Sequence, residues 1–480
     1  MNYRLLGHRL GIIGLISLIE GLSGFILLPI LTRNISIEDY GIWVQINLAL
    51  ALLPAIATLG LPYTMVRFLA AISNREEIKE KFYSIVFTGL FSGMIASFVL
   101  FLFAEPIAEK IFNGNLTIIR LLSIIILIEC LNSLFVAFFR TFQQTGKYLL
   151  FSLISISINA SLVAYFILSF HNIIYAEVGL CISRLIVLLI TAYLIISEIG
   201  IKIPNFRSIN KFLTFGIPFA IQNLFGWIIT SSDRFVIGII LGTAFVGYYS
   251  PGYALGNIIG IFITPLGFLL PAVLSKLYDK NDLYEAKIVF RYTLKYYLLL
   301  VIPCAFGLSL LSENILVLIS TQEIAVKGHL ITPIIALSAV IYGINVLFSH
   351  ILLLEKKTKI IGITWVIAAI LSLVLNLLVV SNIGIFGAAI TALITYTFIF
   401  ISTLHYSIKS PVVDLDLISI FKSIFASILM STVIYYCKPN SPLDILTVIA
   451  GSAIVYVATL VLLRAANNNE VHFFKHLLGI

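Results

Sequence analysis

Long apolar runs recur along almost the whole of this 480-residue chain and restrict what it can fold into. Many of them reach about twenty residues, the length that a helix needs to cross a ~30 Å hydrocarbon core. Hydrophobic residues make up 60% of the chain and charged residues only 11%, too few to cover the surface of a soluble protein of this size. Membrane-barrel strands are about ten residues long and alternate in polarity, unlike these continuous runs. The sequence therefore predicts an all-α, multi-span membrane protein.

We expect about 14 transmembrane helices, whose orientation follows from the positive charges. They cover residues 10–32, 41–66, 82–104, 117–139, 148–170, 176–197, 212–241, 247–275, 292–312, 328–354, 360–380, 384–408, 418–437 and 443–463. Lys and Arg stay on the cytoplasmic side of short loops. With the N-terminus inside, the outer connections hold only Arg33, Lys110, Arg120, Lys327 and Lys438. Both termini are therefore predicted to be cytoplasmic, and the net charge of +8 mostly reflects this bias and gives no support for nucleic-acid binding.

An internal repeat divides the chain. The stretch SIEDYGIW (36–43) resembles TAFVGYYS (243–250), and ATLGLPYTMVRFL (57–69) resembles TPLGFLLPAVLSKL (264–277), at offsets of 206 and 207 residues. This period spans six helices, so the copies have the same orientation and form a parallel repeat. We expect a six-helix N-terminal lobe (1–205), a six-helix C-terminal lobe (206–410), and helices 13 and 14 with a cytoplasmic tail (411–480). Such lobes commonly rock about a central site to give alternating access.

Helices 2 and 8 carry Pro and Gly at related places, and we interpret them as hinge or cavity-lining helices. The residues are Pro54, Gly60 and Pro62 in the first copy, and Gly260, Pro265, Gly267 and Pro271 in the second. Pro and Gly permit kinks in a bilayer where neighbouring groups satisfy the freed carbonyls. Simple tolerance of these residues in membrane helices is the alternative explanation.

Ionisable side chains deep in the predicted spans mark the candidate site, because they are costly in lipid and normally face a bundle interior or a wet cavity. They are Glu20, Glu129, Arg184, Asp233 and Arg234. Adjacent helical residues point about 100° apart, so we expect Asp233 and Arg234 to be poor partners for each other. We expect their counter-ions on other helices: Arg184 for Asp233, and Glu20 or Glu129 for Arg234.

Further polar residues extend this candidate site. Asn223 and Trp227 share the helical stripe of Arg234, and Arg33 and Arg140 lie at the ends of their spans. The alternative for the deep charges is an interhelical ion pair that fixes packing and binds no ligand. The alternative for the two terminal arginines is an interfacial anchor.

Motifs that would indicate catalysis or a metal site are missing from the sequence. It contains no phosphate-binding glycine loop, no HExxH and no nucleophile elbow. The four cysteines have no metal-ligand spacing. We therefore expect no catalytic residues, no metal and no cofactor.

Five stretches together resemble the polysaccharide-biosynthesis flippase family of the multidrug/oligosaccharidyl-lipid/polysaccharide exporter superfamily. They are LLPILTRNISIEDYGIW (27–43), AFFRTFQQTGKY (137–148), SSDRFVIGIILGTAFVGYYSPGYALGN (231–257), LLPAVLSKLYDKND (269–282) and NIGIFGAAITALIT (382–395). The resemblance implies a plasma-membrane transporter, not an enzyme. It would move a polyprenyl- or dolichyl-diphosphate-linked oligosaccharide from the cytoplasmic to the outer leaflet, through a cationic cavity between the lobes. Helices 13 and 14 would form a groove for the lipid tail.

The resemblance also bears on individual residues. Arg33, Arg140, Asp233 and Arg234 fall on family motif positions, whereas Glu20, Glu129 and Arg184 are candidates from their place in the spans alone. Guanidinium offers a diphosphate a planar fork of donors. Carboxylates beside such arginines could take up H⁺ or Na⁺ and couple transport to an ion gradient. We expect a monomer that works with a glycan polymerase or ligase.

Three alternatives remain open. A drug/cation antiporter of the same superfamily would want an acidic, aromatic-lined cavity, which Arg184 and Arg234 disfavour. A peptidoglycan-precursor flippase would use the same chemistry on another head group. An integral-membrane glycosyltransferase could use the acidic pair Glu38-Asp39, but the short outer loops leave little room for that chemistry.

Overall fold

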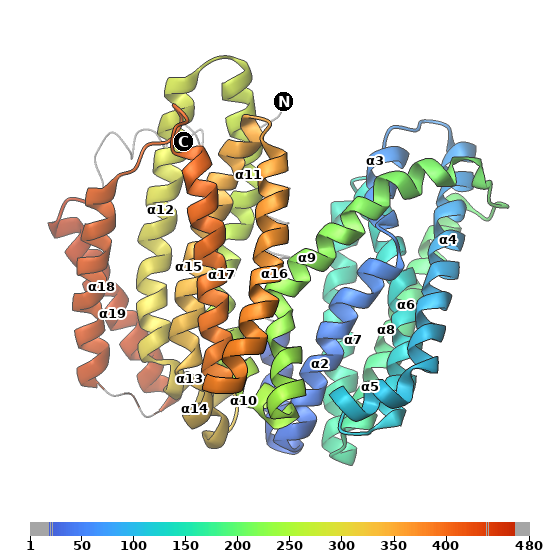
Figure 1. Ribbon diagram of the computed structural model, residues 1–480, viewed down its shortest axis with the longest axis horizontal. Helices are drawn as coiled ribbons and strands as arrows, with labels where there is room; N and C mark the ends of the chain where they lie inside the picture. Colours follow the sequence, from blue (N-terminus) through green and yellow to red (C-terminus); the bar gives the residue numbers. More distant parts are fainter. Residues whose placement is uncertain (1–18, 20, 22, 438, 440, 466–480) are drawn as a thin grey trace. The chain divides into compact units, whose positions relative to one another are not determined.

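The computed structural model describes residues 19, 21, 23–437, 439 and 441–465 and is all-helical over that part of the chain (Figure 1). Thirteen helical segments among these residues are long and apolar enough to cross a membrane. The prediction of an all-α, multi-span protein is therefore confirmed. Of the first predicted helix, 10–32, the structure describes residues 19, 21 and 23–32, and the stretch 23–34 is helical. The predicted orientation of the termini stays a prediction.

Contacts within the chain define two units, which we describe separately. Unit 1 comprises Met1–Ser250 and Ala369–Ala388, and unit 2 comprises Pro251–Ala368 and Ala389–Ile480. This partition differs from the predicted division at 205/206 and 410/411, because the helix Ile209–Leu241 packs against helices of unit 1. The predicted lobes stay a prediction.

Unit 1 is built on helices that pack around two apolar cores. They are α2 (Ile37–Ala57), α3 (Leu61–Leu69), α4 (Arg75–Leu102), α5 (Ala104–Ile111), α6 (Leu116–Thr141), α7 (Thr145–Phe170), α8 (Ile173–Ile199), η1 (Phe206–Ser208), α9 (Ile209–Leu241) and α10 (Thr243–Asn257), whose last residues belong to unit 2. α6 packs against α2, α4, α7 and α8, and α9 packs against α2 and α3. One core contains the buried Trp43, Leu122 and Leu180, and the other contains Phe82 and Phe138.

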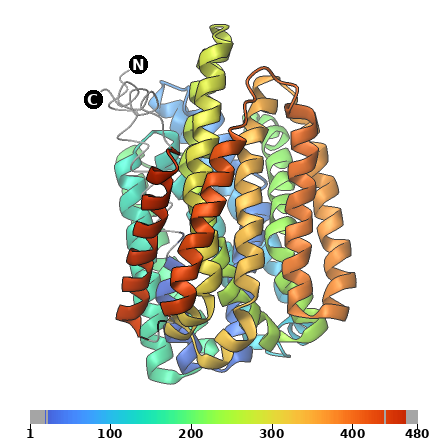
Figure 2. The same cartoon turned by 90° about the vertical axis from the view of Figure 1, so that its left-hand side faces the viewer.

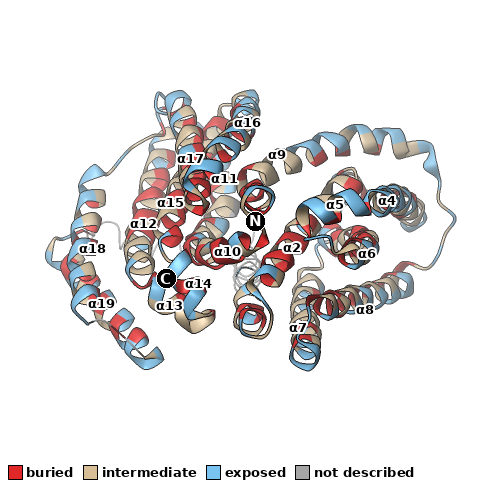
Figure 3. Ribbon diagram, turned by 60° about the horizontal axis from the view of Figure 1, so that its bottom comes forward, coloured by how far each residue is buried: buried red, intermediate tan, exposed pale blue. Residues whose placement is uncertain are grey.

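Unit 2 follows a similar plan and carries the last two described helices. Its elements are η2 (Ile258–Phe262), α11 (Ile263–Asp279), α12 (Leu283–Leu310), α13 (Ser312–Ile319), α14 (Gln322–Gly328), α15 (Ile331–Leu354), α18 (Leu417–Cys437) and α19 (Pro442–Leu462), while α16 (Thr358–Ile383) and α17 (Ile385–Ser407) are shared with unit 1. α18 packs against both α12 and α19, as the red helices of Figure 2 show. Burial is extensive along α15 and sparse along α19 (Figure 3).

Predicted helices 2 and 8 are both interrupted in the structure, whereas their role as hinge or cavity-lining helices stays a prediction. The first helix breaks between α2 and α3, where Gly60 adopts a left-handed φ of 70° and Pro62 lies in the first turn of the next helix. The Pro54 carbonyl at this break accepts from both the backbone N–H and the hydroxyl of Thr58. In the second copy the 3₁₀ segment η2 separates α10 from α11 just before Pro265. The kinks thus occur at similar, but not identical, places in the repeat.

The strongest structural sign of the repeat is a close crossing of α2 and α10. A Cβ added at Gly41 would collide with the carbonyl oxygen of Thr243, and one added at Gly247 would collide with the carbonyl oxygen of Ile37. Gly41 is equivalent to Gly247, and Ile37 to Thr243, at the offset of 206 found in the sequence. Equivalent residues therefore make reciprocal contacts, as a two-fold arrangement of the copies requires.

In unit 2, an ionic cluster fastens the start of α18 to α12. Asp414 lies 3.7 Å from Lys287 and 3.3 Å from Arg291, and Asp416 lies 3.8 Å from Arg291 and 3.5 Å from Lys295. The three cations follow one another at four-residue spacing, so they form one stripe along α12. Burial raises the pKa of Asp416, but hydrogen bonds from the Ser419 side chain and backbone and the charges of Lys295 and Arg291 together hold it below its usual 3.8.

We expect Asp416→Asn to destabilise the purified protein by on the order of 1 kcal/mol at pH 7. A carboxyl whose pKa is lowered by folding stabilises the protein at pH values above its pKa in the unfolded chain, 3.8. This stabilisation is lost as the pH falls through the pKa of the folded state. The wild type should therefore lose thermal stability below about pH 4, and the variant should lack this component. Asp282→Asn, the same change at the exposed start of α12, should leave the acid-sensitive component in place. Identical acid profiles for wild type and Asp416→Asn would contradict the expectation.

Candidate functional site

Asp233 and Arg234 form the centre of a buried polar group on α9. Each residue is 5% exposed. The Tyr249 hydroxyl, from α10, donates to Asp233 Oδ2 at 2.8 Å, and the Arg234 guanidinium lies 5.8 Å from the centre of the Tyr249 ring. Arg234 Nη1 donates to the Thr230 carbonyl at 3.0 Å, one turn back along the same helix. The group is thus assembled by α9 and the helix that follows it.

The expectation that Asp233 and Arg234 are poor partners is wrong. Arg234 Nη1 lies 3.6 Å from Asp233 Oδ1, and the Arg234 backbone N–H donates to the same oxygen at 2.9 Å. The angular separation of adjacent residues holds for their Cβ atoms, but the long arginine side chain folds back toward Thr230 and brings its guanidinium to the carboxylate. The two charges therefore compensate each other locally.

The predicted pairing of Arg184 with Asp233 is wrong, and Glu129 is not the partner of Arg234. The pairing of Glu20 with Arg234 stays a prediction, because Glu20 lies outside the described residues. Arg184 Nε lies 3.5 Å from Glu129 Oε2, so Arg184 pairs with α6 and not with Asp233. α8 packs directly against α6, which brings these two mid-span charges together. Asn132 donates to the Arg184 carbonyl at 3.1 Å, and Arg184 Nη1 donates to Ser155 of α7 at 3.3 Å. About a quarter of each charged side chain stays exposed, in contrast to the Asp233–Arg234 pair.

The other predicted site residues occupy different environments. Arg33 and Arg140 are exposed, at the end of the helical stretch 23–34 and in the last turn of α6. Trp227 is half-buried; its indole N–H donates to the Leu48 carbonyl of α2 at 3.0 Å, and its ring packs on Phe235. Asn223 is half-buried on α9. Glu20 lies outside the described residues.

Sequence reasoning missed two buried polar residues of unit 1. Glu177, in the second turn of α8, and Gln45, on α2, are both 0% exposed, and neither has a hydrogen-bond partner for its side chain among the described residues. Glu177 has no other charged residue within four positions, a signal that could have found it.

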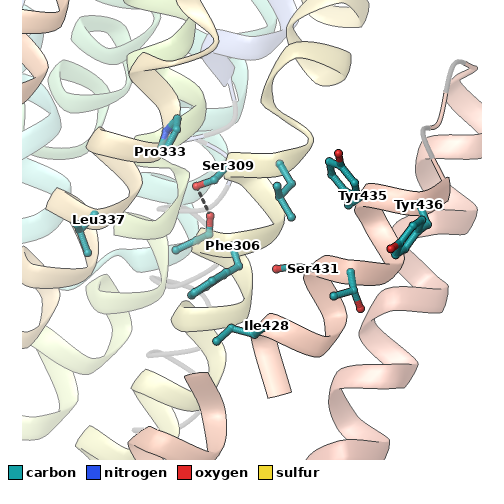
Figure 4. A pocket seen from close by; sticks show the side chains of 11 residues that line it. Phe306, Ser309, Pro333, Leu337, Ile428, Ser431, Tyr435 and Tyr436 are labelled. Carbon is teal, nitrogen blue, oxygen red and sulfur yellow. Dashed lines mark hydrogen bonds between the residues drawn. The ribbon is translucent and has the colours of Figure 1, made fainter. Parts of the chain in front are cut away.

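An apolar groove of about 560 Å³ lies between α12, α15 and α18 of unit 2 (Figure 4). Its lining includes Phe306, Leu337, Ile428, Tyr435 and Tyr436. The serine and threonine hydroxyls in its wall donate to carbonyls of their own helices: Ser309 to Ala305, Ser431 to Ser427, and Thr432 to Leu429. The wall therefore presents a surface that suits a hydrocarbon chain.

The family model for "Polysaccharide biosynthesis protein" matches residues 7–277, more than half of the chain. The chain belongs to the polysaccharide biosynthesis protein family. The MatE family model also matches, over residues 218–378. The family suggested by the sequence motifs is thereby confirmed.

Two relatives of this family member carry functional names. It is 22% identical over 207 residues to the probable low-salt glycan biosynthesis flippase Agl15 of Haloferax volcanii, and 26% identical over 270 residues to a putative O-antigen transporter of Shigella flexneri. The matched region spans 44% and 63% of those relatives, respectively.

Two solved structures share the fold of this chain. The lipid II flippase MurJ in an inward closed conformation has a TM-score of 0.75 at 19% identity, over 95% of this chain and 98% of that one. An inward-facing multidrug resistance MATE family transporter of the MOP superfamily has a TM-score of 0.65 at 13% identity, over 88% and 96%. At these identities the likeness concerns the fold alone.

Proposed function

We propose that this family member is a flippase that moves a polyprenyl- or dolichyl-diphosphate-linked oligosaccharide from the cytoplasmic to the outer leaflet of the plasma membrane. Two guanidinium groups paired with carboxylates within membrane spans, in a chain of the polysaccharide biosynthesis family, carry the proposal. Cations at this depth are costly and are retained where they serve a pathway or a substrate. The names of the two relatives agree with glycan transport.

The two arginines suit an anionic head group in different ways. A diphosphate accepts charge-assisted hydrogen bonds from the planar guanidinium fork. Arg184 is partly exposed, so it can exchange Glu129 for a phosphate without a large rearrangement. Arg234 is buried against Asp233 and would bind only in a conformation that opens this group. Alternating access supplies such a change of conformation.

The lipid tail would lie in the groove between α12, α15 and α18. A tail kept in apolar surroundings retains its hydrophobic stabilisation while the head group crosses. We further propose that the protein acts as a monomer alongside a glycan polymerase or ligase, and that transport is coupled to a proton or sodium gradient.

Reconstitution into vesicles tests the function. A fluorescent lipid-diphosphate oligosaccharide should move between leaflets in a protein-dependent way, with unchanged glycan mass. A changed mass would favour a glycosyltransferase, whereas preference for a peptidoglycan precursor or an organic cation would favour the two superfamily alternatives. Rates indifferent to both pH and sodium gradients would contradict ion coupling.

Filling the groove tests the place of the tail. We expect Leu337→Trp to slow transport of a full-length polyprenyl substrate severalfold and to spare a short-chain analogue, because the bulkier ring occupies the space of the tail. Leu446→Trp, on the exposed surface of α19, is the matched control and should affect neither substrate. Equal slowing of both substrates by Leu337→Trp would place the tail elsewhere.

A further inference from the structure

Glu177 is an acidic residue enclosed by an apolar core. It is 0% exposed, and neither carboxylate oxygen has a hydrogen-bond partner among the described residues. Its helical neighbours Ile173, Ala176 and Leu180 belong to the larger core of unit 1 and are at most 3% exposed. Neither the deep ion pairs nor the proposed transport pathway uses it.

The charged and titratable groups around Glu177 are engaged elsewhere. α8 packs against α2, α6 and α7. On these helices and on α8 itself, the groups to consider are Tyr40, Arg120, Glu129, Tyr165, His171, Tyr175 and Cys181. Tyr175 is exposed, and its ring stacks on Phe170. Arg120 is exposed and lies 5.7 Å from the centre of the Phe101 ring, and Glu129 pairs with Arg184. Tyr165 and His171 are exposed. Tyr40 is buried and interacts electrostatically with Arg234. Cys181 is a neutral thiol one turn further along α8.

An ionised carboxylate cannot be accommodated in these surroundings, because burial of an unpaired charge costs far more than burial of the neutral acid. We propose that Glu177 is a proton-binding site of the transporter: it holds a proton in the conformation described here and releases it to water when the start of α8 opens. One proton joins one carboxylate oxygen on binding and leaves to solvent on release. The site rests on the geometry, whereas its part in coupling rests on the proposed function.

A proton fits this place better than a metal cation. A hard cation needs several oxygen ligands at once. No cluster of three or more Asp, Glu, His or Cys side chains that could hold a metal occurs within the described part of the chain, and Glu177 has no polar partner there. A proton needs one oxygen only.

The start of α8 offers a route for release. Glu177 lies four residues after Ile173, the first residue of α8, which is about 6 Å along the helix axis. A small opening of this end would bring water to the carboxyl. The same carboxyl can therefore be neutral in one conformation and charged in another.

If Glu177 had a purely structural role, replacing it would lower the melting temperature, which is the opposite of what the proposal predicts. An unpaired buried polar group weakens a fold, so a structural residue at this place would be apolar. We expect Glu177→Leu to raise the melting temperature by a few degrees. Gln45→Leu is the matched control, because Gln45 is equally buried and unpaired but cannot titrate; it should also raise the melting temperature and leave every pH response unchanged.

Infrared spectroscopy of the purified protein without substrate tests the site directly. At pH 7 the wild type should show a protonated-carboxyl band that is missing in Glu177→Gln and retained in Gln45→Leu. In vesicles, Glu177→Gln should flatten the pH profile of transport, whereas Gln45→Leu should keep it. Lack of the band in the wild type, its persistence in Glu177→Gln, or an unchanged pH profile in that variant would each overturn the proposal. The infrared result stands even if lipid-linked glycan proves not to be the substrate.

Discussion

Arg234→Ala is expected to abolish export of the lipid-linked glycan while the chain still inserts into the membrane. The substitution removes the guanidinium fork that would bind the diphosphate. It also leaves Asp233 buried with the Tyr249 hydroxyl as its remaining described hydrogen-bonding side chain, and breaking a buried ion pair commonly costs about 3–5 kcal/mol. Surface glycan and the amount of membrane-inserted protein should therefore be measured together. Full export by this variant would remove Arg234 from the site.

A double variant separates loss of the substrate contact from loss of the ion pair. Asp233→Asn with Arg234→Gln removes both charges at once, so no uncompensated charge stays buried. If Arg234 contacts the diphosphate, the double variant should be stable and inactive. If Arg234 serves only to neutralise Asp233, the double variant should export glycan, and the proposed role would be wrong. Arg234→Lys, which keeps the charge but not the fork, should retain partial export.

Gly41→Ala is expected to destabilise the protein by about 3 kcal/mol, near the upper end for overpacking. The added methyl group would collide with the backbone carbonyl of Thr243, which cannot move aside as a flexible side chain can. The melting temperature of the purified protein and its yield in membranes should both fall. The measurement is thermal unfolding in detergent at fixed lipid content.

The matched control for Gly41 is Gly226→Ala on α9. A Cβ at Gly226 meets nothing within 4 Å, so the gain in helix propensity should leave stability unchanged or raise it by up to about 1 kcal/mol. Equal effects of the two substitutions would show that the crossing of α2 and α10 is looser than described.

Properties that depend on local composition could be predicted from the sequence. The apolar runs predicted the spans. Gly60 and Pro62 indicated the place of the break between α2 and α3, because Gly readily adopts a left-handed turn and Pro lacks a backbone N–H, and both effects are local. The structure differs from the prediction between some spans. The stretches 105–116 and 313–327, which the prediction left between helices, contain most of the short helices α5, α13 and α14.

Contacts between helices could not be predicted in the same way. Periodicity shows which residues share a face, but it does not show which helix that face meets. Arg184 therefore had several candidate partners, and only the packing of α8 on α6 selects Glu129. Asp233 receives its hydrogen bond from Tyr249, a tyrosine that the sequence does not distinguish from its neighbour Tyr248. Glu177 was missed because burial depends on the surrounding helices and not on its own position in the span.

The reciprocal crossing of Gly41 and Gly247 resembles the contact that two identical subunits would make with each other. Two separate subunits would have to carry every charge twice and would come apart on dilution. In a single chain, neither restriction applies. At the offset of 206, the positions equivalent to Asp233 and Arg234 are Leu27 and Leu28, both apolar and buried. Joining the two copies in one chain has thus allowed the ion pair to exist in one copy of the repeat only, opposite no such pair at the equivalent positions of the other.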